Sequence, residues 1–69
     1  MHQSNLLQTL KVRREQLGVT QEQLAELADV ALRTIKALDS GKGNPTVSTL
    51  MKLADVLGME LKLEVRKPS

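Results

Sequence analysis

Apolar residues recur every three or four positions through most of the chain, which is the spacing of amphipathic helices. The first such stretch is predicted to end at Gly18, because glycine is common just past a helix C-terminus. Its buried stripe is expected to comprise Leu6, Leu10 and Leu17, with Leu7 beside them.

A second helix is predicted to begin after Thr20, because Thr20 and Gln23 form the pattern of a capping box. After a short break at residues 29–31, a third helix is predicted to stop at residues 40–41. The buried positions expected on these two helices are Leu24, Ala25, Leu27 and Ala28 on the first, and Ile35 and Leu38 on the second.

Residues 42–45 are predicted to form a loop, because they contain the helix breakers glycine and proline. Thr46 is the predicted N-cap of a fourth helix, which Gly58 ends. The buried positions expected on this helix are Val47, Leu50, Leu53, Ala54 and Leu57.

The hydrophobic period changes from 3.6 to 2 after this helix. Apolar side chains then alternate with charged ones, which predicts a half-buried β-strand over residues 59–66. Its apolar positions are Met59, Leu61, Leu63 and Val65. One strand cannot form a sheet, so its partner is expected to be another copy of the chain or another protein.

The charges on this strand predict how two copies pair. When two strands run antiparallel about Leu63, Glu60 faces Arg66 and Lys62 faces Glu64. A slip of two residues brings like charges opposite one another, which destabilises the pair. The pattern therefore favours a homodimer with one strand register. The alternative is that the strand packs on its own helices as an exposed edge.

The composition narrows the chemistry. The chain has 69 residues, a net charge of +2, no cysteine and a single histidine, His2, so it fits one small domain in which no metal or cofactor is expected. No set of catalytic residues is present, which argues against an enzyme. There is no Phe, Trp or Tyr on which single-stranded bases could stack, so nucleic-acid binding is expected to use a duplex.

Two absences bear on location. No apolar run approaches the roughly 20 residues that a membrane span needs, and the polar N-terminus MHQSN does not resemble a signal peptide. A cytoplasmic protein without a membrane partner is therefore expected.

Residues 20–41 read TQEQLAELADVALRTIKALDSG, which predicts two short helices separated by a turn. This is the arrangement of a helix-turn-helix motif, whose second helix enters the major groove of DNA. Residues 31–52 carry four cations against one carboxylate, a net charge of +3, whereas residues 19–30 have a net charge of −3. Such a distribution is typical of a protein with one DNA-facing surface.

The segments LGVTQEQLAELADVA, TIKALDSGKGNPT and LMKLADVLG follow one another at characteristic spacing. Over residues 5–58 the sequence resembles the XRE (Cro/cI-type) helix-turn-helix family. The resemblance implies a mainly α, lambda-repressor-like four-helix DNA-binding domain over that range. It also implies a buried ion pair between Arg14 and Asp39.

The resemblance further implies a recognition helix from about Leu32 to Asp39 that contacts double-stranded DNA. Base contacts are expected at Leu32, Arg33, Thr34, Lys36 and Ala37. Among these, Arg33 suits bidentate binding to guanine. Phosphate contacts are expected at Thr20, Gln21, Lys42, Asn44 and Thr46.

Two positions depart from the family pattern. Asp29 stands in the turn where the family prefers glycine, and aspartate tolerates the left-handed conformation better than most residues. Ala31 replaces the usual serine or threonine at the N-cap of the recognition helix, which costs about 1 kcal/mol. Both departures predict weaker or retuned operator binding with an unchanged fold.

The C-terminal sequence GMELKLEVRKPS resembles that of HipB-like antitoxins, in which a short strand pairs across the dimer. This resemblance implies an autoregulating repressor of a toxin–antitoxin operon that binds an inverted-repeat operator and a HipA-like kinase toxin. Two alternatives stand beside it. One is a stand-alone phage-type or restriction-control regulator, and the other is a protein-interaction module with weak DNA binding.

Overall fold

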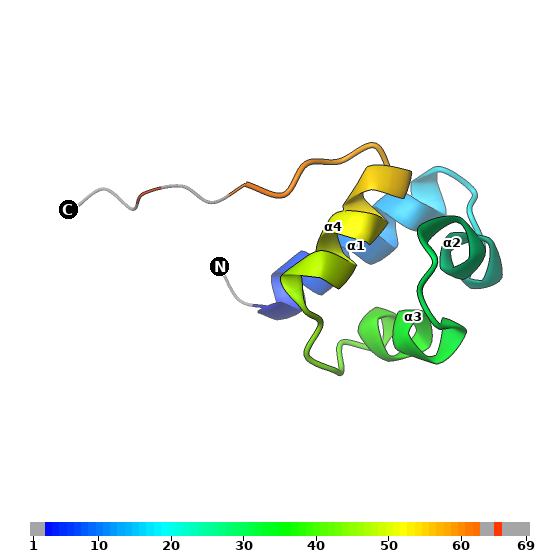
Figure 1. Ribbon diagram of the computed structural model, residues 1–69, viewed down its shortest axis with the longest axis horizontal. Coiled ribbons are helices and arrows are strands. Elements are labelled where there is room, and N and C mark those ends of the chain that lie inside the picture. Colours follow the sequence, from blue (N-terminus) through cyan, green and yellow to red (C-terminus); the bar gives the residue numbers. More distant parts are fainter. Residues whose placement is uncertain (1–2, 63–64, 66–69) are drawn as a thin grey trace.

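The computed structural model describes residues 3–62 and residue 65, and most of these residues are helical. The helices are α1 (Gln3–Gln16), α2 (Gln21–Ala28), α3 (Leu32–Asp39) and α4 (Val47–Val56). Figure 1 shows α1 behind α4, with α2 and α3 at the end of the molecule away from the two termini. A mainly helical fold with four helices in the predicted order is thus confirmed.

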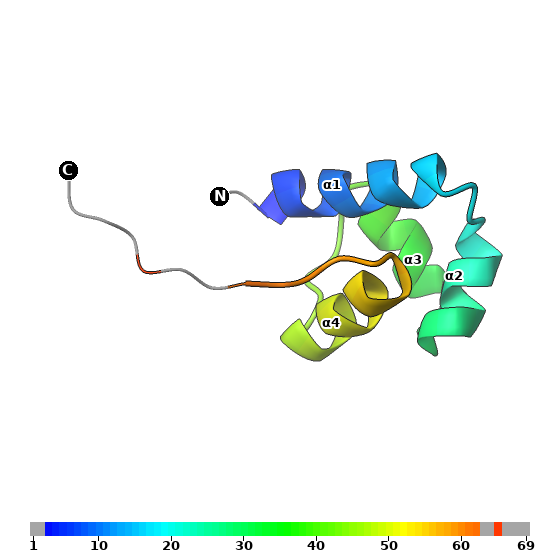
Figure 2. The ribbon, with the colours of Figure 1, turned by 90° about the horizontal axis from the view of Figure 1, so that it is seen from above.

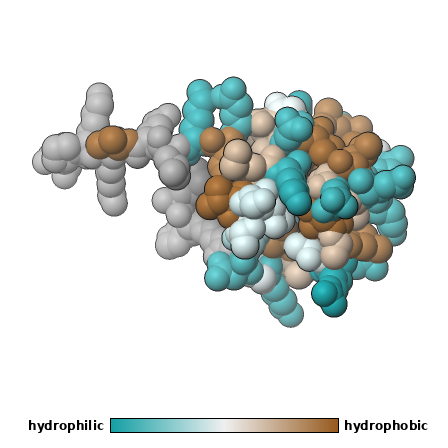
Figure 3. All heavy atoms as spheres, in the orientation of Figure 1, coloured by the Kyte–Doolittle hydropathy of each residue, from teal (hydrophilic) through white to brown (hydrophobic). Residues whose placement is uncertain are grey.

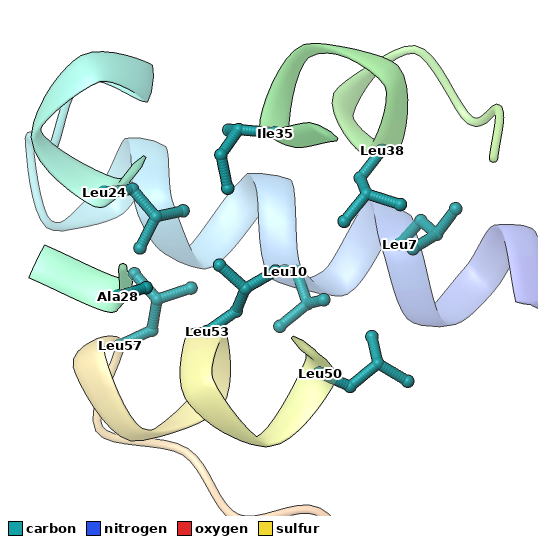
Figure 4. Packing of buried hydrophobic residues seen from close by; sticks show 9 residues of the cluster. All are labelled: Leu7, Leu10, Leu24, Ala28, Ile35, Leu38, Leu50, Leu53 and Leu57. Atoms are coloured by element: carbon teal, nitrogen blue, oxygen red, sulfur yellow. The ribbon is translucent and has the colours of Figure 1, made fainter. Parts of the chain in front are cut away.

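One hydrophobic core lies where the four helices meet (Figure 4). Ile35 and Leu57 are its most deeply buried members, with 1% and 0% of their surface exposed. Each helix contributes its buried residues at intervals of three or four positions, as the helical period predicted. The core consists of Leu7, Leu10, Leu24, Ala28, Ile35, Leu38, Leu50, Leu53 and Leu57.

All four helices end in the same way, on a residue with left-handed backbone geometry. These residues are Gly18, Asp29, Gly41 and Gly58. In each case the next N–H donates a hydrogen bond of 2.8–3.1 Å to the carbonyl five residues before it, which is the Schellman closure. Asp29 adopts φ 55° and ψ 49°, so aspartate takes the left-handed conformation expected of it.

The N-termini differ in how their first N–H groups are satisfied. The Thr20 hydroxyl accepts from the Gln23 N–H at 3.0 Å and the Gln23 side chain accepts from the Thr20 N–H at 2.9 Å, which confirms the capping box. Thr46 caps α4 by accepting from the Thr49 N–H at 3.1 Å. Ala31 has no side-chain cap, as its residue type requires.

Three residues predicted to be buried are exposed instead. Leu17 lies one position beyond the end of α1, where the helical stripe no longer applies, and is 45% exposed. Leu27 is 66% exposed because α2 packs on the core through Leu24, Ala25 and Ala28, and Leu27 lies outside this row. Val47, the first residue of α4, is 64% exposed. Figure 3 shows hydrophobic side chains reaching the surface between hydrophilic ones.

The segment after α4 runs along one side of α1 and α4 and then leads away from the helices (Figure 1 and Figure 2). Met59 and Leu61 are half-buried against the core, whereas Val65 is 96% exposed. Residues 59–62 and 65, the described part of the predicted strand, carry no strand in this single chain. Leu63 lies outside the described residues, and pairing with a second copy stays a prediction.

Candidate nucleic-acid interface

The two helices of the predicted motif are joined by a tight turn and packed against each other. The left-handed Asp29 reverses the chain, and the Val30 N–H donates to the Ala25 carbonyl at 3.0 Å. Val30 and Ala25 both pack against the core, so these contacts fix the turn on the rest of the domain. This geometry fixes α3 on the core and leaves its other side to solvent.

The inward face of α3 fixes which of its residues point outward. Ile35 and Leu38 are buried, so positions half a turn away face solvent. Arg33 and Lys36 are exposed, while Leu32, Thr34 and Ala37 are half-buried. The residues predicted to contact bases are therefore two exposed cations and three half-buried uncharged side chains on the same helix.

The residues predicted to contact phosphate lie at two helix N-termini and in the loop between α3 and α4. Thr20 and Thr46 are the N-caps of α2 and α4, and both are exposed. A helix N-terminus presents N–H groups and a partial positive charge, which suits an anion. Lys42 and Asn44 are exposed in the loop.

An open hollow joins the recognition helix to this loop. It has a volume of about 420 Å³. It is lined by Arg33, Thr34, Ala37, Leu38, Gly43, Asn44 and Pro45. The structure thus brings a predicted base-contact residue, Arg33, and a predicted phosphate-contact residue, Asn44, to the walls of one hollow.

A polar network links the recognition helix to α1 and α2. Arg14 Nη2 donates to Asp39 Oδ2 at 2.9 Å, and the two side chains are 11% and 13% exposed. Arg14 Nη1 also donates to the Val19 carbonyl at 2.7 Å. The Arg14 Nε is buried without a hydrogen-bond partner in the described structure, so the guanidinium depends on these two acceptors. The pair expected from the resemblance is therefore present and nearly buried.

Gln21 belongs to the same network, a contact that the sequence did not indicate. Its Nε2 donates to Asp39 Oδ2 at 2.8 Å and joins the N-terminus of α2 to the last residue of α3. Because one N–H of this amide group is engaged, a phosphate at Gln21 would meet its second N–H together with the backbone N–H groups of the first turn, which lack intrahelical acceptors.

Arg13 makes a second contact that the sequence did not indicate. Its Nε donates to the Leu57 carbonyl at 3.0 Å and so caps the C-terminus of α4 from α1. The two residues are 44 positions apart, and no local pattern marks them as neighbours. This bond fixes α1 against the end of α4, and the Arg14 network fixes α1 against the end of α3 and the segment before α2.

The cations of α3 and the following loop are unpaired among the described residues. Two ion pairs occur in that part of the chain, Arg14 with Asp39 and Lys62 with Glu60 at 3.5 Å, and neither involves a cation of residues 31–52. The cations on α3 and the loop are Arg33, Lys36 and Lys42, all exposed, whereas Lys52 lies on α4 beside the hollow that Met51 and Met59 line. The surface formed by α3 and the following loop is therefore positively charged and able to meet a polyanion.

These features define a helix-turn-helix domain, and comparison with known proteins agrees. The helix-turn-helix family model matches residues 10–63. Two similar relatives are both described as uncharacterized HTH-type transcriptional regulators. The one from Haemophilus influenzae is 38% identical over 58 residues, covering 84% of this chain and 59% of its own length. The one from Methanothermobacter thermautotrophicus is 39% identical over 51 residues, covering 74% of each chain.

The chain belongs to the XRE-type helix-turn-helix family. It spans 59% of the length of the Haemophilus relative. No helix in the described ranges has both the length and the hydrophobicity to cross a membrane.

Proposed function

We propose that this protein is a sequence-specific, double-stranded DNA-binding transcriptional repressor and not an enzyme. The observation that carries the proposal is the outer face of α3, where Arg33 and Lys36 are exposed and unpaired opposite the buried Ile35 and Leu38. Such a helix can enter the major groove, which admits an α-helix. A regulator of this kind acts where the chromosome lies, so a cytoplasmic location belongs to the same proposal.

In this proposal the side chains of α3 read bases. Arg33 donates bidentately to guanine, and Lys36 reaches guanine acceptors or a phosphate. Leu32 and Ala37 contact thymine methyl groups, and Thr34 is a further base contact in this proposal. The support is that all five lie on α3 and that Arg33, Thr34 and Ala37 line the hollow beside it.

Phosphates on either side of the groove are held by the flanking elements. The N-termini of α2 and α4 offer N–H groups beside Thr20, Gln21 and Thr46, and the loop adds Lys42 and Asn44. Both helix N-termini carry N-capped first turns, which fixes the direction of their N–H groups. Phosphate contacts of this kind set the register of the protein on the duplex.

The proposed active form is a homodimer joined by the strand over residues 59–66, which recognises an inverted repeat. Two hollows flank the start of this segment, and both are partly lined by Met59. One, of about 500 Å³, lies on the α4 side with Met51 and Leu61 in its wall. The other, of about 360 Å³, lies on the α1 side with Val12.

The favoured strand register supplies residues to cover this apolar surface. In that register Val65 of the second copy lies opposite Leu61, on the same face of the two-stranded ribbon. Val65 is 96% exposed in the single chain, and Met51 is 57% exposed. Pairing therefore brings exposed apolar side chains together while it matches every charge along the strand.

The finer proposal is an autoregulating, HipB-like antitoxin that also binds a HipA-like kinase toxin. The C-terminal strand pattern supports it, since the resemblance to such antitoxins rests on that segment. Copurification of the full chain with a kinase encoded beside it tests this step. A chain that binds DNA but captures no such kinase would instead be a stand-alone regulator.

The experiment that tests DNA reading is selection of duplexes from a randomised library, followed by binding measurements on the enriched sequence. We expect an inverted repeat, and we expect Arg33→Ala to weaken binding by about 1–3 kcal/mol, or roughly 5- to 150-fold. Lys11→Ala, which removes an equal charge from α1, is the control and should change affinity little. Equal losses in both variants would show that binding is unspecific attraction to phosphate.

A further inference from the structure

Both methionines in the described part of the chain line a single surface hollow. This hollow, of about 500 Å³, is formed by α4 and the segment that follows it. Met51 lies on α4 with 57% of its surface exposed, and Met59 is half-buried against the core. Ala54 and Leu61 are the other apolar residues of its wall. Two thioether side chains therefore share an open and mostly apolar surface.

The composition of the chain makes these sulfur atoms its most readily oxidised groups. There is no cysteine, tryptophan or tyrosine to react first, and three methionines are present. Oxidants convert the thioether of methionine into a sulfoxide, a polar group that methionine sulfoxide reductases return to the thioether. Because access to solvent favours the reaction, we expect Met51 to be oxidised before the half-buried Met59.

The same hollow lies where the proposed dimer forms, so this inference rests on that proposal. In the favoured strand register, Val65 of the second copy lies opposite Leu61, which shares the hollow with Met51. A sulfoxide oxygen on Met51 is hydrated while the hollow is open, but it loses that water when pairing covers the hollow. Oxidation therefore favours separated chains, and pairing shields Met51 from oxidants.

We propose that Met51 is a reversible oxidation site that controls formation of the dimer. A lone pair of the Met51 sulfur attacks one oxygen of a peroxide, the O–O bond breaks and an S–O bond forms. The sulfur is oxidised by two electrons, and the peroxide is reduced. The departing hydroxide takes the proton of the transferred hydroxyl group and leaves as water. Because a separated chain reads only one half of an inverted repeat, oxidation releases the operator.

The test is sedimentation of the full chain before and after treatment with hydrogen peroxide, with peptide mass spectrometry to locate each added oxygen. We expect oxidation of Met51 to weaken dimerisation by about tenfold or more, as burial of an unsatisfied polar group does. Methionine sulfoxide reductases with a dithiol should restore the dimer. Met51→Gln, which places a polar group there permanently, should pair weakly without peroxide.

Two leucine variants identify the responsible sulfur. Leucine and methionine are similar in volume, so Met51→Leu should pair like the untreated chain. We expect the dimer of Met51→Leu to survive peroxide, whereas the dimer of Met59→Leu should still weaken because Met51 remains. Far-UV circular dichroism checks that the oxidised chains keep their helices. A Met51→Leu dimer that peroxide weakens as much as the original would assign the effect to another methionine and overturn the proposal.

Access to the oxidant gives a second readout. Relative to free methionine in the same solution, we expect Met51 to be oxidised more slowly as the protein concentration rises, because pairing covers its side chain. A constant rate across the range in which the chain dimerises would place Met51 outside the interface and overturn the proposal.

The same data separate this inference from the proposed dimer. An untreated chain that is monomeric at every concentration would refute the dimer, and this inference with it. An untreated dimer that oxidation of Met51 leaves intact would refute this inference alone.

Discussion

Removing the carboxylate of Asp39 is expected to be the most destabilising single change to the polar network. Asp39 Oδ2 accepts from Arg14 Nη2 at 2.9 Å and from Gln21 Nε2 at 2.8 Å. Asp39→Ala leaves a guanidinium that is 11% exposed with the Val19 carbonyl as its remaining acceptor. Hydrogen bonds to charged groups contribute about 1.5–3 kcal/mol, and a buried charge left without its partner costs about 3–5 kcal/mol.

Because one acceptor for Arg14 remains, we expect Asp39→Ala to lower the free energy of unfolding by about 2–4 kcal/mol. This loss is close to the whole free energy of unfolding of so small a domain, because a core below roughly 70–80 residues supplies about 3–5 kcal/mol. A loss of 1 kcal/mol lowers Tm by about 4–8 °C at this length, so the Tm should fall by roughly 8–32 °C.

The assay is urea unfolding followed by far-UV circular dichroism, because the chain has no aromatic residue to report by fluorescence. Asp55→Ala is the control, since Asp55 is exposed on α4 and forms no ion pair among the described residues. The double variant Arg14→Met with Asp39→Leu removes both charges and should regain most of the lost stability. If Asp39→Ala unfolds at the same urea concentration as Asp55→Ala, the network contributes nothing and the reasoning is refuted.

Three further predictions concern the motif and the dimer. Ala31→Ser should stabilise the protein by about 1 kcal/mol, because Ala31 has the extended geometry of an N-cap at φ −59° and ψ 138°; an unchanged urea midpoint would mean that α3 needs no cap. Asp29→Gly should raise the urea midpoint and Asp29→Val should lower it, since β-branched residues resist the left-handed conformation; equal midpoints would exclude strain at this turn. Leu63→Lys should convert dimer to monomer in sedimentation by placing like charges at the axis, whereas Leu27→Lys should not; a dimer that survives Leu63→Lys would rule out the strand as the interface.

Local patterns were sufficient to predict the helices and their ends. The capping box at Thr20 and the left-handed closure at Gly58 each depend on residues within one or two turns, so the sequence carries them directly. The helical period also predicted most of the core. It failed at Leu17 and Leu27, because a period shows which side of a helix is apolar but not how much of that side its neighbours cover.

Contacts between distant residues were harder to predict. The pair of Arg14 and Asp39 followed from the family resemblance. The bond from Gln21 to the same carboxylate did not, and its partners are 18 residues apart in the sequence. The bond from Arg13 to the Leu57 carbonyl depends on how α1 lies across the end of α4. Such contacts follow from packing and leave no spacing in the sequence that could reveal them.

The most direct test of DNA reading by α3 is an amide NMR footprint of the library-selected duplex on the full chain. We expect the largest shifts in residues 32–37, with further shifts at residues 20–22 and 42–46, and little change along the core-facing positions of α1. Added salt should weaken binding without moving the footprint. Shifts centred instead on Met51 and Met59, with α3 unaffected, would contradict the proposal that α3 is the recognition helix.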